Sequence, residues 1–377
     1  NRVSGNFIGT TSDGAAAAGN ATGVNIRNGS ANNFVGGTTF YEKNVISGQN
    51  ATNNSVGVLI KPDAGVNNTV AGNYLGVSLN GDVGLPNRVG IAVNADNQTI
   101  GNADESQYRN LIISADTSGA YGVYLHPFFP NDELINVTVQ NNTIGTLRFN
   151  NANAGEIGVY LTDNVKSCTV KGNTIGHQGF AGIRLFDGPH NNTISGNRVG
   201  IKTTNDEIPN YNGIAIRQAD TNFVRDNTVS ANTNNGIVIG DSFGQNDPPG
   251  PVAEQWRVFG GSAFASNNIV TGNRVGTDID SKYLIPNGQV AIGVGLNARD
   301  TRIGGPGTEG NIVGGASGKD WPFGIFVGTI NDAASVDSIP HNIKIEGNWV
   351  GISTSSSQIP NGYGIYVRNA ADTVIGG

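Results

Sequence analysis

The sequence predicts an all-β fold, a right-handed parallel β-helix of about eleven coils with three short strands in each coil. Three observations predict this fold class. A four-residue phrase (glycine, apolar, variable, apolar) recurs along the chain, two further phrases rich in glycine and asparagine follow it in fixed order, and helical periodicity is absent throughout the 377 residues. Such repetition is typical of a solenoid, in which each unit packs only against its neighbours.

The first phrase predicts the main strand of each coil, because apolar residues at alternate positions have the period of a strand with one buried face. A degraded copy is expected near residues 290–292. The clear copies are Gly23–Ile26, Gly57–Ile60, Gly90–Val93, Gly122–Leu125, Gly158–Leu161, Gly182–Leu185, Gly213–Ile216, Gly236–Ile239, Gly324–Val327 and Gly364–Val367.

Two further phrases predict the other strands and the corners. One runs Asn-Asn-x-apolar, as at Asn67–Val70 and Asn191–Ile194, and the other is Gly-Asn-x-apolar-Gly, as at Gly72–Gly76 and Gly196–Gly200. Glycine and asparagine tolerate the left-handed backbone that tight corners need. Stacked asparagine side chains are also expected to hydrogen-bond from coil to coil. An antiparallel sandwich, the other all-β possibility, would instead show hairpin turns about every 8–12 residues.

A longer period overlays the coils. Excursions that end in asparagine follow several Gly-Asn phrases, so we expect units of two coils. Residues 1–377 are expected to form a single β-helix domain, which is a portion of a longer chain or a subunit that assembles, because both ends lie inside repeats. The excursions are Thr10–Asn20, Val77–Asn87, Ile201–Asn210, Thr277–Asn287 and Ile352–Asn361.

Composition excludes several classes of protein. The net charge is −7 and basic residues form no runs, which argues against a nucleic-acid partner. No apolar stretch has the roughly 18 residues that a membrane span needs. The single Cys168 excludes an intramolecular disulfide framework, and we expect it to be a small packed side chain.

Candidate site residues lie in and just after the main strands. The variable residue of the phrase and the residue after the phrase are expected to point outward. This places Tyr124, Tyr160, Arg184, His126 and Arg217 on one face, next to loops that include 126–133, 187–190 and 241–261. The binding candidates are Tyr124, Tyr160, Arg184, Arg217 and Trp256, and the catalytic candidates are His126, Asp132, Asp187, His190 and Asp241.

Aromatic rings beside arginine, histidine and carboxylates suit a sugar polymer, because rings stack on pyranose faces and charges orient polar groups. The competing interpretation is structural, since like residues stacked across strands support one another. No metal site or cofactor is predicted. Ca²⁺ is the one ion left open, through Asp82, Asp278 and Asp280, but these residues supply too few oxygen ligands.

With these repeats the chain resembles, over its whole length, the right-handed β-helix repeat proteins of the pectin-lyase-like superfamily. It is more narrowly similar to bacterial secreted and surface proteins that repeat Gly-Asn-x-Ile-Gly-Thr and Asn-Val-Ile-Ser-Gly-Asn. The resemblance implies the fold, but it does not assign a function, because the superfamily includes lyases, hydrolases, epimerases, phage tailspikes and adhesins. The Asp-Pro-His-Asp motif of alginate epimerases and the Asp-Asp and Gly-His-Gly signatures of polygalacturonases do not occur.

Three functions follow as hypotheses. We expect first an extracellular or cell-surface structural or adhesive solenoid that associates with itself through open ends, with a polysaccharide or cell-surface glycan as its ligand. The alternative is a polysaccharide lyase, hydrolase or epimerase that acts on the face with the loops. A carbohydrate-binding protein of the phage tailspike kind is the third.

Overall fold

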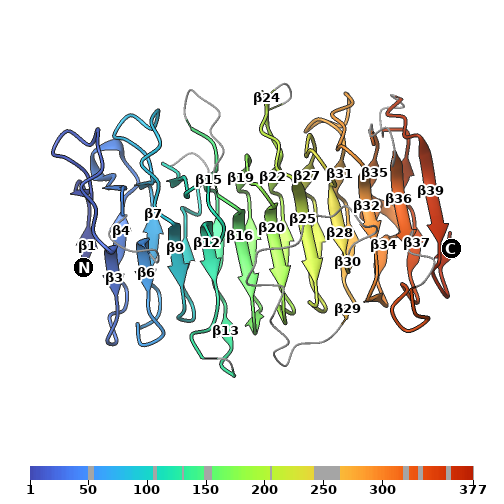
Figure 1. The fold of residues 1–377 in the computed structure, drawn as a ribbon, viewed down its shortest axis with the longest axis horizontal. Coiled ribbons are helices and arrows are strands. Elements are labelled where there is room, and N and C mark those ends of the chain that lie inside the picture. Colours follow the sequence, from blue (N-terminus) through green and yellow to red (C-terminus); the bar gives the residue numbers. More distant parts are fainter. Residues whose placement is uncertain are drawn as a thin grey trace. The chain divides into compact units, whose positions relative to one another are not determined.

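The computed structural model describes residues 1–49, 55–104, 108–129, 131–147, 155–203, 206–241, 264–316, 322–329, 334–353 and 358–376. The chain forms two compact units, unit 1 (Asn1–Gly179) and unit 2 (Phe180–Gly377). Each unit is built from parallel strands stacked side by side (Figure 1). Among the described residues, no helix is long and apolar enough to cross a membrane.

Unit 1 contains three parallel stacks of strands. The main strands are β3 (Thr22–Ile26), β6 (Val56–Ile60), β9 (Val89–Val93), β12 (Tyr121–Leu125) and β16 (Ile157–Thr162). The second stack is β1 (Arg2–Val3), β4 (Phe34–Gly36), β7 (Thr69–Ala71), β10 (Thr99–Ile100), β14 (Thr138–Gln140) and β18 (Thr169–Lys171). The third is β2 (Phe7–Ile8), β5 (Val45–Ile46), β8 (Tyr74–Leu75), β11 (Leu111–Ile112), β15 (Thr143–Ile144) and β19 (Thr174–Ile175). Outside the stacks lie the pair β13 (Leu134–Ile135) and β17 (Val165–Lys166), and the 3-10 turn Phe40–Glu42.

Unit 2 repeats the arrangement. Its main strands are β20 (Ala181–Phe186), β25 (Asn212–Arg217), β28 (Ile237–Ile239), β32 (Val290–Val294), β36 (Phe323–Gly328) and β39 (Tyr363–Arg368). The second stack is β21 (Thr193–Ser195), β26 (Phe223–Arg225), β30 (Ile269–Thr271), β34 (Arg302–Gly304), β37 (Lys344–Glu346) and β40 (Val374–Ile375). The third is β22 (Arg198–Val199), β27 (Thr228–Val229), β31 (Arg274–Val275), β35 (Ile312–Val313) and β38 (Trp349–Val350). The remaining elements are β23 (Ile201–Thr203), β24 (Asp206–Glu207), β29 (Ala265–Ser266), β33 (Ala298–Arg299) and the 3-10 turn Gly307–Glu309.

The main strand therefore occurs five times in unit 1 and six times in unit 2, which confirms the predicted parallel β-helix of about eleven coils. The main strands of successive coils pair in the expected register, for example with Val58 opposite Ile91 and Ile91 opposite Val123. These inward residues are fully buried, because stacked strands close a core of valine and isoleucine. In the degraded copy the structure places Gly293 opposite Val238, so Ala291 takes the place of the usual glycine.

Asparagine ladders hold successive coils together, as the sequence predicts. In the principal ladder the Nδ2 of one asparagine donates to the Oδ1 of the next, at 2.8 to 3.1 Å. Where the amides are buried these bonds contribute strongly to stability, since an unpaired buried amide is costly. The principal ladder is Asn6, Asn44, Asn73, Asn110, Asn142 and Asn173 in unit 1, and Asn197, Asn227, Asn273, Asn311 and Asn348 in unit 2.

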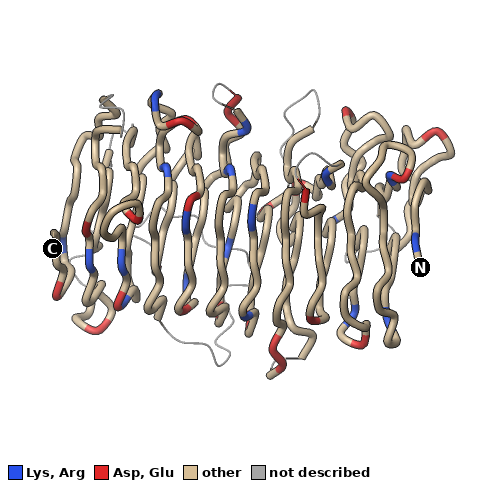
Figure 2. The backbone as a smooth tube through the Cα atoms, turned by 180° about the vertical axis from the view of Figure 1, so that it is seen from behind, with Lys and Arg blue, Asp and Glu red and all other residues tan. Residues whose placement is uncertain are grey.

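The excursions are short antiparallel hairpins. Thr10 bridges Ala17, Val77 bridges Gly84 and Thr277 bridges Leu284, while β23 pairs with β24 in the same way. Charges are spread through both units, and Figure 2 shows Lys and Arg interspersed with Asp and Glu along the described backbone of each. The hairpins and corners therefore decorate a regular scaffold, which fixes the positions of the side chains considered next.

Candidate functional site

The predicted tyrosines of unit 1 form an aromatic cluster on the outer face of β12 and β16. Tyr124 lies opposite Tyr160 in the strand register, and their rings stack with centroids 5.4 Å apart. Tyr121 contacts both rings at 4.9 and 5.0 Å, a contribution that the sequence reasoning missed because this residue precedes the glycine of the phrase. Tyr160 is only 5% exposed, so the cluster buries a ring that we had expected to face a ligand.

His126 extends this cluster and is fixed by hydrogen bonds at both ring nitrogens. Its ring stacks on Tyr124 with centroids 4.1 Å apart. The Nδ2 of Asn94 donates to Nε2 at 2.9 Å, and Nδ1 lies 3.0 Å from the carbonyl oxygen of Pro127. These partners assign the proton to Nδ1 and the lone pair to Nε2. The imidazole therefore anchors the loop that follows β12.

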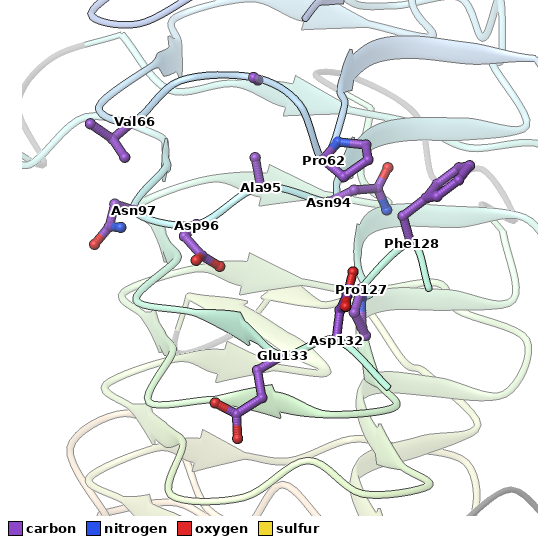
Figure 3. A pocket seen from close by; sticks show the side chains of 11 residues that line it. Pro62, Val66, Asn94, Ala95, Asp96, Asn97, Pro127, Phe128, Asp132 and Glu133 are labelled. Atoms are coloured by element: carbon purple, nitrogen blue, oxygen red, sulfur yellow. The ribbon is translucent and has the colours of Figure 1, made fainter. Parts of the chain in front are cut away.

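A pocket of about 380 Å³ lies beside His126, where the turns that follow β6, β9 and β12 stack on one another (Figure 3). The register of these three strands brings the turns together. We call it the Phe128 pocket. Figure 3 shows Val66 and Asn97 on one side and Phe128 on the other. Its lining is Pro62, Ala64, Val66, Asn94, Ala95, Asp96, Asn97, Pro127, Phe128, Asp132 and Glu133.

The pocket combines one exposed aromatic ring with carboxylates. Phe128 is 56% exposed although it lies in a structured turn. Asp96 Oδ1 accepts a hydrogen bond from the Ile135 backbone N–H at 2.9 Å, which orients that carboxylate. Glu133 pairs with Lys166 at 3.2 Å, and Asp132 is exposed. An exposed ring beside oriented acceptors is the composition of a binding site for a polar ligand that has one apolar face.

The predicted arginines lie in unit 2 and pack on aromatic rings. The Arg184 guanidinium lies 4.9 Å from the Phe180 ring and 5.3 Å from the Phe186 ring, and the residue is 5% exposed. Arg217 lies 5.5 Å from Phe186 and forms an ion pair with Asp241. The low exposure of Arg184 differs from our expectation of an accessible binding residue, because the flanking aromatic side chains cover it.

The remaining candidates have structural contacts. Asp187 is buried in the turn after β20 and has a left-handed backbone, and His190 Nδ1 lies 3.0 Å from the carbonyl oxygen of Gly188. Asp241 also accepts a hydrogen bond from Asn297 Nδ2 at 2.6 Å. Trp256 lies outside the described residues. Thus the structure brings His126 together with Tyr124 and Tyr160, and it brings Arg217 together with Asp241.

The aspartates considered for Ca²⁺ stabilise hairpins. Asp278 Oδ1 accepts the backbone N–H groups of Lys282 and Tyr283 at 2.6 and 3.0 Å. Asp82 Oδ1 accepts the hydroxyl of Ser78 at 2.7 Å. In the ranges that the structure describes, no group of three or more His, Cys, Asp or Glu residues is placed to hold a metal ion.

The single cysteine is packed between coils. Burial raises the pKa of Cys168 to about 12, and its Sγ accepts the Val137 backbone N–H at 3.3 Å. We expect a thiol reagent at about pH 8 to modify the native chain far more slowly than the unfolded chain, because only the thiolate reacts. The folded chain holds the thiol proton of Cys168 more tightly than the unfolded chain does. The stability that this difference in pKa contributes is therefore present below the ordinary pKa of 9.0 and is lost as pH rises through about 12. Equally fast labelling of native and unfolded chains would contradict this burial.

Comparison with solved structures identifies the architecture. The Dettilon tailspike protein is 16% identical, with a TM-score of 0.55 over 93% of this chain and 55% of the tailspike chain. The chain is a right-handed parallel β-helix protein. It spans about half the length of that tailspike. The Azotobacter vinelandii mannuronan C-5 epimerase AlgE4 A-module is 11% identical, with a TM-score of 0.49 over 99% of this chain and 96% of the module. No curated protein sequence matches the chain.

A family model described as periplasmic copper-binding protein (NosD) matches residues 80–248 of this β-helix protein. Copper favours thiolate, thioether and imidazole ligands. The sequence contains no Met, and its one Cys is the buried Cys168. The matched range contains His126, His177 and His190, and both ring nitrogens of His126 have hydrogen-bond partners. Within the described ranges, no group of three or more His, Cys, Asp or Glu side chains is placed to hold a metal ion. The residues that the structure describes therefore do not fit a copper site.

Proposed function

We propose that this β-helix protein works outside the cytoplasm as an adhesive or structural solenoid that binds a carbohydrate polymer at the Phe128 pocket. The observation that carries the proposal is the exposed ring of Phe128 at the edge of a pocket with Asp96, Asp132 and Asn94. Aromatic rings pack on the apolar face of a sugar, while carboxylates and amides hydrogen-bond to its polar groups. The match of residues 80–248 to a family described as periplasmic supports the location.

Binding without turnover is favoured over catalysis by the contacts of two of the five catalytic candidates, His126 and Asp241. His126 has partners at both ring nitrogens, and Asp241 is held by Arg217 and Asn297. A general base needs an accessible lone pair within reach of the proton that it removes. Binding requires only that side chains are held at fixed positions, and the stacked strands of a solenoid hold them so. Association of the solenoid through its ends stays a prediction.

The test is affinity electrophoresis of the chain through gels that contain neutral, amino-sugar or uronate polysaccharides. We expect one class to retard the wild-type chain and Phe128→Ala to weaken that interaction about tenfold, the effect of roughly 1.4 kcal/mol. Tyr283→Ala is the matched control, because Tyr283 is 64% exposed on the hairpin of residues 277–284 and does not line the pocket.

Two results would overturn the proposal. If Phe128→Ala binds as tightly as Tyr283→Ala, the pocket is not the contact surface. If incubation of the wild-type chain with the retarding polymer releases shorter or chemically altered products, the protein is an enzyme and the non-catalytic role is wrong.

A further inference from the structure

We propose that the Phe128 pocket recognises a protonated amino group, so that the polymer it binds contains unacetylated amino sugars. The inference rests on the proposed function and specifies its ligand. It depends on the hydrogen-bond acceptors that line the pocket, which are the amide oxygen of Asn94 and the carboxylates of Asp96 and Asp132.

Asn94 supplies the first of these acceptors. This side chain is 8% exposed and lines the pocket. Its Nδ2 donates to His126 twice, to Nε2 at 2.9 Å and to the carbonyl oxygen at 2.8 Å, so both amide hydrogens are in use. No donor in the described part of the chain reaches Asn94 Oδ1. This oxygen is not fully buried, so a ligand that enters the pocket can donate a hydrogen bond to it.

The carboxylates add charge to the same pocket. Asp96 and Asp132 line it, and Asp96 keeps Oδ2 available because the Ile135 N–H occupies Oδ1. Glu133 is the third carboxylate, and Lys166 offsets its charge. The lining contains no Lys, Arg or His. Ionised carboxylates are acceptors only, so the pocket requires donors and favours positive charge.

A protonated amine matches this surface. An ammonium group carries three donors and no acceptor, so it can donate to acceptors of this pocket while the sugar ring lies against Phe128. Figure 3 shows Asn94, Asp96 and Asp132 among the side chains that line the pocket. Acetylation removes the charge and two of the donors. A uronate instead introduces a charge of the same sign as the carboxylates of the pocket, and the repulsion disfavours its binding. The expected order of affinity is amino sugar, then N-acetylated sugar, then uronate.

Titration calorimetry with glucosamine, N-acetylglucosamine and galacturonate oligomers of equal length tests the inference. In a buffer of about pH 5.5, carboxylates are ionised and amines are protonated. We expect glucosamine oligomers to bind about tenfold more tightly than the acetylated ones, with an affinity that falls as salt is added. Asp132→Asn should weaken glucosamine binding about fivefold and leave acetylated oligomers unaffected. Asp116→Asn, at an exposed carboxylate outside the pocket, should change neither.

Each other outcome has a defined meaning. Equal affinity for glucosamine and N-acetylglucosamine oligomers, or a preference for galacturonate, overturns the amino-group inference, while a loss of affinity in Phe128→Ala would still support the proposed function. A third result would also overturn the amino-group inference. If oligolysine binds as tightly as the glucosamine oligomer and Phe128→Ala changes neither affinity, the pocket binds basic peptides. Absence of binding to every sugar contradicts both the inference and the proposed function.

Discussion

Gly122→Ala is expected to destabilise unit 1 by about 3 kcal/mol, the upper part of the range for an overpacked core. A Cβ at this position would lie 2.5 Å from the carbonyl oxygen of Gly158 and 2.5 Å from Ile144 Cγ2. One contact is the backbone of the next coil and the other is a buried side chain, so neither can move without disturbing a stacked strand. Urea unfolding followed by circular dichroism measures the change as a lower midpoint.

The control for this substitution is Gly84→Ala. A Cβ there meets no atom within 4 Å, and Gly84 lies in the hairpin of residues 77–84. The control should unfold within about 0.5 kcal/mol of the wild type, as surface substitutions usually do. If Gly122→Ala and Gly84→Ala unfold at the same urea concentration, the close packing of the main strands is not as the structure describes.

Asn110→Ala is the second substitution with a large expected effect, about 3 kcal/mol of lost stability. The side chain is fully buried, and its Oδ1 accepts the N–H and Nδ2 of Asn73 at 2.9 and 3.1 Å. Its Nδ2 donates to the carbonyl oxygen of Val70 and to Asn142 Oδ1, each at 2.8 Å. Alanine removes these four bonds and leaves the Asn73 N–H and Asn142 Oδ1 buried without their partner. The Val70 carbonyl keeps the Gly101 N–H, and Asn73 Nδ2 keeps the Val35 carbonyl. Hydrogen exchange should show the loss of protection centred on Asn73 and Asn142.

Asn6→Ala is the matched control, because Asn6 belongs to the same ladder but is exposed. When the Asn6 side chain is removed, Asn44 Oδ1 still accepts the Asn6 backbone N–H at 3.0 Å, so we expect a loss below about 1 kcal/mol. If Asn6→Ala and Asn110→Ala lower the free energy of unfolding equally, burial of the ladder does not strengthen its hydrogen bonds, and this account of the ladder is wrong.

Much of the scaffold could be predicted from the sequence because period-2 strands separated by glycine and asparagine admit few ways to bury their apolar face. The register of Tyr124 with Tyr160 and the ladder through Asn73 and Asn110 follow from that spacing alone. The sequence places the degraded copy near residues 290–292 only approximately, because Ala291 replaces the glycine that marks the phrase elsewhere.

The site was less predictable, because accessibility depends on neighbouring turns and rings. Alternation along β20 places Arg184 outward, but Phe180 and Phe186 cover it. Phe128 and Asp132 lie in a loop that the sequence singled out, while the role of Asn94 could not be anticipated. That role depends on two hydrogen bonds to His126, a residue of the next coil.

The central claim, that the Phe128 pocket binds sugar, is tested most directly by a crystal structure of the chain with a short glucosamine oligomer. We predict a sugar ring against Phe128 and an amine nitrogen within hydrogen-bond distance of Asn94 Oδ1 and of a carboxylate oxygen of Asp96 or Asp132. An oligomer ordered elsewhere on the chain, with the pocket empty, would contradict the claim.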